Sequence, residues 1–164
     1  MCYTIQIVPL ESLYPKGNHI MKKTTLKNYA RLLAECGVAV KKGDPVIIQA
    51  SLDQPEFVAL CVEACYKCGA AAVRVEWYYQ PLTKLHARYQ SVKTLGTVQE
   101  WEKEKLQHYV DTVPCRIHLI SDDPDGLKGV NTAKLAKGRQ LSYPILKPYS
   151  DARNGQEQWC GAAV

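Results

Sequence analysis

Four short apolar runs, each separated from the next by a helical pattern, limit the folds open to this chain more than any other feature. Runs of this length are typical of buried strands, and the stretches between them are long enough for crossover helices. The runs cover residues 46–48, 73–77, 115–119 and 159–164. Strands that alternate with helices form an open, mainly parallel sheet with helices on both faces. We therefore expect an α/β fold of Rossmann-like form.

Helical patterns occupy the stretches between these runs. The first is predicted from Thr25 to Gly37, with one apolar stripe at 3- and 4-residue spacing. The stripe comprises Leu26, Tyr29, Ala30, Leu33 and Cys36. Further helical regions are expected over residues 82–92, 97–110 and 131–154, the last despite Pro144 and Pro148.

The second helix has a recognisable start. Asp53-Gln54-Pro55-Glu56 offers an acidic N-cap residue, a proline in the first turn and a glutamate three residues after the aspartate. This pattern resembles a capping box with Asp53 as the N-cap. We expect the helix to run to about Cys68 and to end at Gly69.

Length and charge exclude several classes of protein. The 164 residues suffice for one ordinary domain. The net charge is only +5 and the basic residues are scattered, so we expect no nucleic-acid partner. No apolar stretch is long enough to span a membrane, and no export signal is evident. With an odd number of cysteines, seven, we expect reduced thiols in a cytoplasmic protein.

The two ends of the chain call for separate interpretations. Residues 1–20 show no clean period, whereas a well-formed helix follows Met21 at once. Lys16-Gly17 can be encoded by codons that resemble a bacterial ribosome-binding site, so Met21 rather than Met1 is the expected start and residues 1–20 a non-native leader. A flexible N-terminal tail is the alternative. At the other end the last strand has no turn or polar tail, so we expect residues 21–164 to form a truncated domain with an incomplete sheet.

Three cysteines have a spacing that admits chemical readings. Cys61, Cys65 and Cys68 follow the C-x3-C-x2-C pattern of iron–sulfur ligands in radical enzymes, and the last two also form a CxxC pair. The same positions lie on the apolar stripe of the second helix, where cysteine acts as a small hydrophobic residue. The CxxC pair lies at a helix C-terminus, where the dipole disfavours a thiolate. Structural thiols are the favoured interpretation, with an iron–sulfur or redox protein left open.

No other residues assemble into a catalytic, cofactor-binding or metal-binding motif. His86 and His108 fall on polar helix positions, and His118 lies on the polar side of a strand, from which it could meet Glu76. The acidic segment 122–126 lacks the register of a calcium loop and is read as a turn. The glycines are isolated, with neither a dinucleotide-binding fingerprint nor a P-loop. The residues alone therefore predict a fold and no catalytic, cofactor or metal site.

Several blocks nevertheless resemble one enzyme family in the same order along the chain. Residues 27–46 resemble the first helix and strand entry of the thermophilic-type metallo-aminopeptidases, the aminopeptidase T and aminopeptidase S (PepS) family, and residues 64–77 resemble its next helix–strand unit. Residues 121–125, 146–149 and 158–160 resemble its later blocks. The resemblance covers residues 21–164 and only the N-terminal part of the family.

The resemblance implies a function as well as a fold. The family removes N-terminal residues from peptides with two divalent metals (zinc, cobalt or magnesium), which would polarise the scissile carbonyl and generate hydroxide. Its glutamate, histidine and aspartate ligands lie in the C-terminal part, so none is assigned to residues 21–164. The resemblance further implies a homodimer for the full-length protein. We expect the chain alone to be inactive; a stand-alone Rossmann-like binding module without catalysis is the alternative.

Overall fold

The computed structural model describes residues 22–163, which divide into two compact units. The first unit contains residues 22–78, 114–121 and 157–163, and the second contains Tyr79–Val113 and Asp122–Gln156. The leader proposed for residues 1–20, and with it the choice between Met1 and Met21, lies outside the described residues. Each unit is considered separately.

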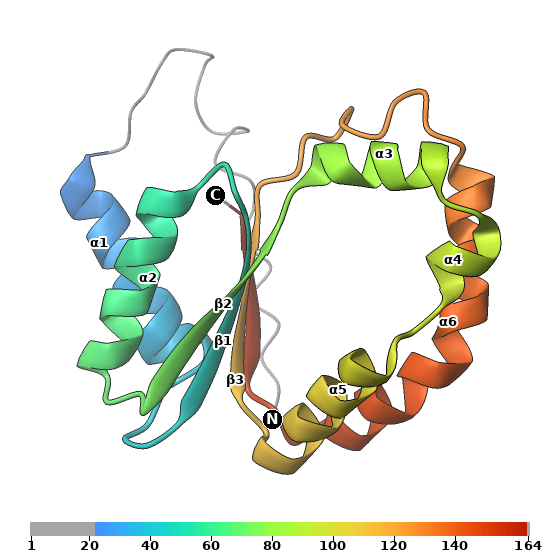
Figure 1. The fold of residues 1–164 in the computed structure, drawn as a ribbon. Helices are drawn as coiled ribbons and strands as arrows, with labels where there is room; N and C mark the ends of the chain where they lie inside the picture. Colours follow the sequence, from blue (N-terminus) through green and yellow to red (C-terminus); the bar gives the residue numbers. More distant parts are fainter. Residues whose placement is uncertain (1–21, 164) are drawn as a thin grey trace. The chain divides into compact units, whose positions relative to one another are not determined.

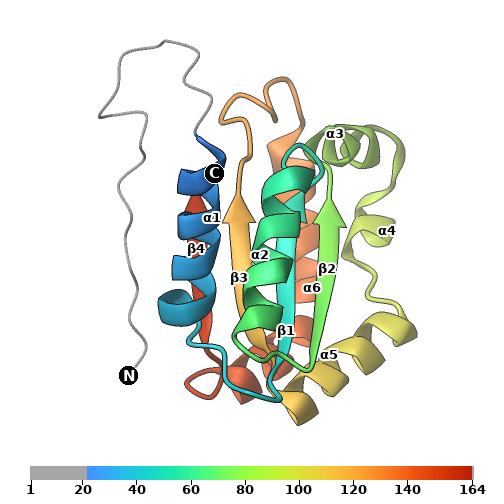
Figure 2. The same ribbon diagram turned by 90° about the vertical axis from the view of Figure 1, so that its left-hand side faces the viewer.

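The first unit is built on a four-stranded, entirely parallel sheet (Figure 2). Its strands are β1 (Pro45–Ser51), β2 (Ala72–Tyr78), β3 (Cys115–Ile120) and β4 (Trp159–Ala163), in the order β2-β1-β3-β4. In the register of the sheet, Ile48 lies beside Val75 on one side and Ile117 on the other. The predicted α/β fold and all four predicted strands are confirmed.

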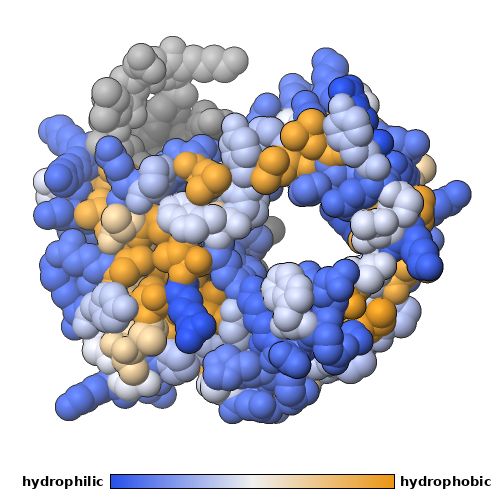
Figure 3. Space-filling model, in the orientation of Figure 1, coloured by the Kyte–Doolittle hydropathy of each residue, from blue (hydrophilic) through white to orange (hydrophobic). Residues whose placement is uncertain are grey.

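One face of this sheet is covered by helices α1 (Lys23–Leu32) and α2 (Pro55–Lys67) and a π-helical turn, η2 (Leu33–Gly37) (Figure 1). Tyr29 of α1 stacks on Phe57 of α2 with ring centroids 5.4 Å apart. Apolar side chains gather between these helices and the sheet, as Figure 3 shows. Burial of this face from water is the main favourable contribution to folding.

The first helix ends differently from the sequence pattern. Its last turn is π-helical, with the Val38 N–H bound to the Leu33 carbonyl oxygen at 3.0 Å. The wider turn shifts the positions that follow, so Ala34 is buried and Cys36, predicted on the apolar stripe, is exposed. Gly37 lies against β4, where a Cβ atom would be 2.9 Å from the Cys160 sulfur. Only glycine permits this approach without displacement of a neighbour.

The predicted capping box of the second helix is wrong. Helix α2 begins at Pro55 with Gln54 as its N-cap, and no side chain caps it. Asp53 therefore lies one position too early, and Glu56 is one position short of the capping-box glutamate. The Asp53 carboxylate instead accepts a hydrogen bond from the Ser121 hydroxyl at 2.8 Å. Gly69 ends the helix region as expected, with φ at +101°.

The second unit is helical, with α3 (Gln80–Tyr89), α4 (Val92–Gly96), α5 (Glu100–Thr112) and α6 (Thr132–Arg153). The predicted helical regions are confirmed, and α4 is an additional short helix. Its start is capped by the Ser91 hydroxyl, which accepts the Thr94 N–H at 3.0 Å. Helix α6 is the longest, and no described helix is long and apolar enough to cross a membrane.

The acidic segment after β3 is a turn, as predicted. The Asp123 carboxylate accepts the Asp125 N–H at 3.0 Å, and the Asp123 carbonyl accepts the Gly126 N–H at 2.8 Å. Gln80 contacts the same turn by donating to the Asp123 carbonyl at 2.9 Å. Aspartates that accept such local bonds are typical of turns.

Candidate functional site

Two regions of the first unit meet the general criteria for a site in a parallel α/β sheet. The first is the carboxyl edge between β1 and β3, where the order of the strands reverses. Ligands of open α/β sheets bind outside the carboxyl ends of the strands at such a switch point. The loops that follow β1 and β3 meet here through the Asp53–Ser121 hydrogen bond.

The chemistry of this pair is limited. A serine nucleophile requires a base that takes its proton, most often an imidazole held by a third group. The observed partner of Ser121 is the carboxylate of Asp53, and both residues lie in loops at the surface. We therefore interpret this hydrogen bond as a structural link between the two loops.

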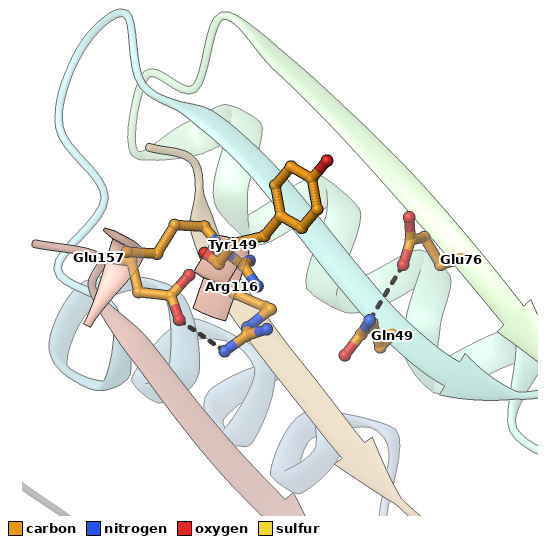
Figure 4. A network of polar contacts seen from close by, with 6 residues as sticks. Gln49, Glu76, Arg116, Tyr149 and Glu157 are labelled. Carbon is orange, nitrogen blue, oxygen red and sulfur yellow. Dashed lines mark hydrogen bonds and ion pairs between the residues drawn. The ribbon is translucent and has the colours of Figure 1, made fainter. Parts of the chain in front are cut away.

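The second region, here called the polar face, is the sheet face on which Gln49, Glu76 and Arg116 lie, beside the buried Ile47 of β1. Gln49 of β1 donates through Nε2 to Glu76 Oε2 of β2 at 3.0 Å (Figure 4). Arg116 of β3 pairs through Nη2 with Glu157 Oε1 at 2.6 Å, just before β4. The Glu157 side chain is only 9% exposed and that of Arg116 28% exposed. Charges held this far from water need partners, and these have them.

His118 and Tyr78 complete the polar face. Their rings meet edge to face with centroids 6.4 Å apart. The Tyr78 hydroxyl donates to the Leu119 carbonyl oxygen at 3.4 Å. The ring of His118 thus contacts that of Tyr78, and Glu76 accepts a hydrogen bond from the side-chain amide of Gln49. His86 and His108 are exposed, as predicted.

The described part of the chain contains no group of three or more His, Cys, Asp or Glu side chains that could hold a metal ion. On the polar face the carboxylates of Glu76 and Glu157 bind Gln49 and Arg116. Carboxylate, amide and guanidinium groups in this arrangement can orient a polar partner by hydrogen bonds. They do not form the adjacent nucleophile and base that covalent catalysis requires.

The predicted structural role of the helical thiols agrees with the structure. Cys61 and Cys65 are fully buried on the sheet side of α2, and Cys68 is half-buried. Burial raises the pKa of Cys61 and Cys65 to about 12, and that of Cys160 to about 11. A thiol must ionise to bind a metal or attack a disulfide. Near neutral pH these side chains therefore act as small hydrophobic groups.

Sequence reasoning missed most of the polar face. Gln49 carried a usable signal, because it is a polar residue directly after the apolar run 46–48. Glu157 carried none, since it precedes β4 in a polar stretch and its partner lies 41 residues earlier in the chain. Pairings over such distances depend on the strand order, which the local pattern does not contain.

Known proteins match most of this chain. The model of the thermophilic metalloprotease (M29) family matches residues 22–164. The solved structure of wild-type AmpT from Thermus thermophilus has a TM-score of 0.77 and 23% sequence identity to this chain. The match covers 87% of this chain and 36% of AmpT, and it supports the fold described above.

Two curated relatives are similar in sequence. Aminopeptidase AmpS of Bacillus subtilis is 32% identical over 124 residues, which are 76% of this chain and 30% of AmpS. Aminopeptidase PepS of Streptococcus thermophilus is 26% identical over 143 residues, which are 87% of this chain and 35% of PepS. The chain thus spans 30–35% of the length of these two relatives.

Proposed function

The chain belongs to the thermophilic metalloprotease (M29) family, and from this we propose that it forms the N-terminal part of a metal-dependent aminopeptidase that removes N-terminal residues from peptides. The observation that carries the proposal is the family match over residues 22–164. The relatives AmpS and PepS are both aminopeptidases, and they match the chain over most of its length.

We place the catalytic metal ligands outside residues 22–163. A two-metal centre needs several carboxylate and imidazole side chains directed at one point. The described residues do not fit this requirement, because no such group of three or more is present among them. The carboxylate of Glu157, whose side chain is largely buried, binds a guanidinium, and the carboxylate of Glu76 binds an amide. The two divalent ions, zinc, cobalt or magnesium, would be held by the family's remaining two thirds.

The role proposed for this chain is therefore that of a non-catalytic α/β domain. Its sheet is a rigid support, and its polar face presents oriented hydrogen-bonding groups. The complete enzyme would be a homodimer in the cytoplasm. In support of the compartment, the six cysteines among the described residues are all free thiols.

A hydrolysis assay on the purified chain tests this proposal. Residues 1–164 are incubated with an aminoacyl-p-nitroanilide and with zinc, cobalt or magnesium in turn, and bound metal is measured by mass spectrometry after dialysis. We expect no turnover and no stoichiometric metal. Full-length AmpS serves as the active control. Turnover by the chain alone that a chelator abolishes and added metal restores would contradict the proposal.

A further inference from the structure

We draw no further inference here: the strongest candidate, the exposed apolar stripe of Leu82, Leu85 and Tyr89 along helix α3 of the second unit, carries none because nothing in the structure shows what covers it.

Discussion

On one face of the sheet Ile48, Ile117 and Leu119 are at most 1% exposed and lie under helices of the same unit. On the other face the alternating residues of these strands include Gln49 and Arg116, which are held by hydrogen bonds to acidic side chains. In β3 the buried residues Ile117 and Leu119 thus alternate with more exposed ones, whereas in β1 Ile47 is buried on the polar face as well. The apolar face therefore supplies most of the stability, while the hydrogen-bonded groups of the polar face contribute less per residue.

The largest expected effect comes from the apolar face. Ile117→Ala removes buried atoms and leaves a cavity, so we expect a loss of about 2–5 kcal/mol in the free energy of unfolding. Ile120→Ala on the same strand is the matched control, because Ile120 is 46% exposed on the other face. Urea denaturation measures both. Equal losses for the two variants would contradict a larger contribution of the apolar face to stability.

The buried thiols make the apolar face sensitive to alkali. Burial raises the pKa of Cys61 to about 12, well above that of an exposed thiol, so the thiol of the unfolded chain ionises first as the pH rises. The contribution of this thiol to stability is therefore fully present below about pH 9, and it is lost as the pH rises from 9 to the folded pKa of about 12. We expect a loss of about 1 kcal/mol per pH unit for each such thiol.

Denaturation at pH 7 and pH 10 measures this loss. Cys61→Ala should weaken the pH dependence by the contribution of one thiol. Val58→Ala on the same helix should leave it unchanged, because valine carries no ionisable group. An identical alkaline loss in both variants would show that Cys61 is not responsible.

The ion pair of the polar face should have an intermediate effect. Arg116→Met leaves the largely buried carboxylate of Glu157 without its guanidinium, and we expect a loss of about 2 kcal/mol in the free energy of unfolding. The exposed pair Arg31–Glu35 is the control, and Glu35→Gln should change stability by less than about 0.5 kcal/mol. If the two variants lost the same free energy of unfolding, burial would not make the Arg116–Glu157 pair more important than an exposed ion pair.

The smallest expected effect is at Gln49. Gln49→Ala removes one neutral donor to Glu76, and we expect a loss of about 1 kcal/mol in the free energy of unfolding, measured by urea denaturation. Gln107→Ala, which removes a bond to Asp111 on the exposed side of α5, should cost less than about 0.5 kcal/mol. A loss at Gln49 as large as that at Ile117 would erase the distinction between the two faces.

Local patterns were enough to predict the strands and most of the helices. Cys115, Ile117 and Leu119 alternate with polar residues, and the structure buries all three. The pattern failed where geometry departs from the ideal period. The π turn turns Cys36 outward, and the start of α2 at Pro55 frees Asp53 to bind Ser121. Such shifts of one residue depend on tertiary contacts.

The candidate site was harder to predict than the fold. Gln49 and Glu76 are 27 residues apart in the chain, and they meet only because β1 and β2 are paired in one register. The Arg116–Glu157 pair likewise requires β4 to lie beside β3. Neither relation leaves a local signal. The family resemblance, by contrast, was carried by several blocks in order, and the match over residues 22–164 confirms it.

We propose above that residues 22–164, which match the M29 family, form a non-catalytic part of a metallo-aminopeptidase. The most direct measurement is the turnover of a chimera in which residues 22–164 replace the matching N-terminal segment of AmpS, assayed on an aminoacyl-p-nitroanilide with and without a chelator. The account predicts metal-dependent hydrolysis by the chimera and none by either part alone. A folded chimera that binds metal but does not hydrolyse the substrate would contradict it.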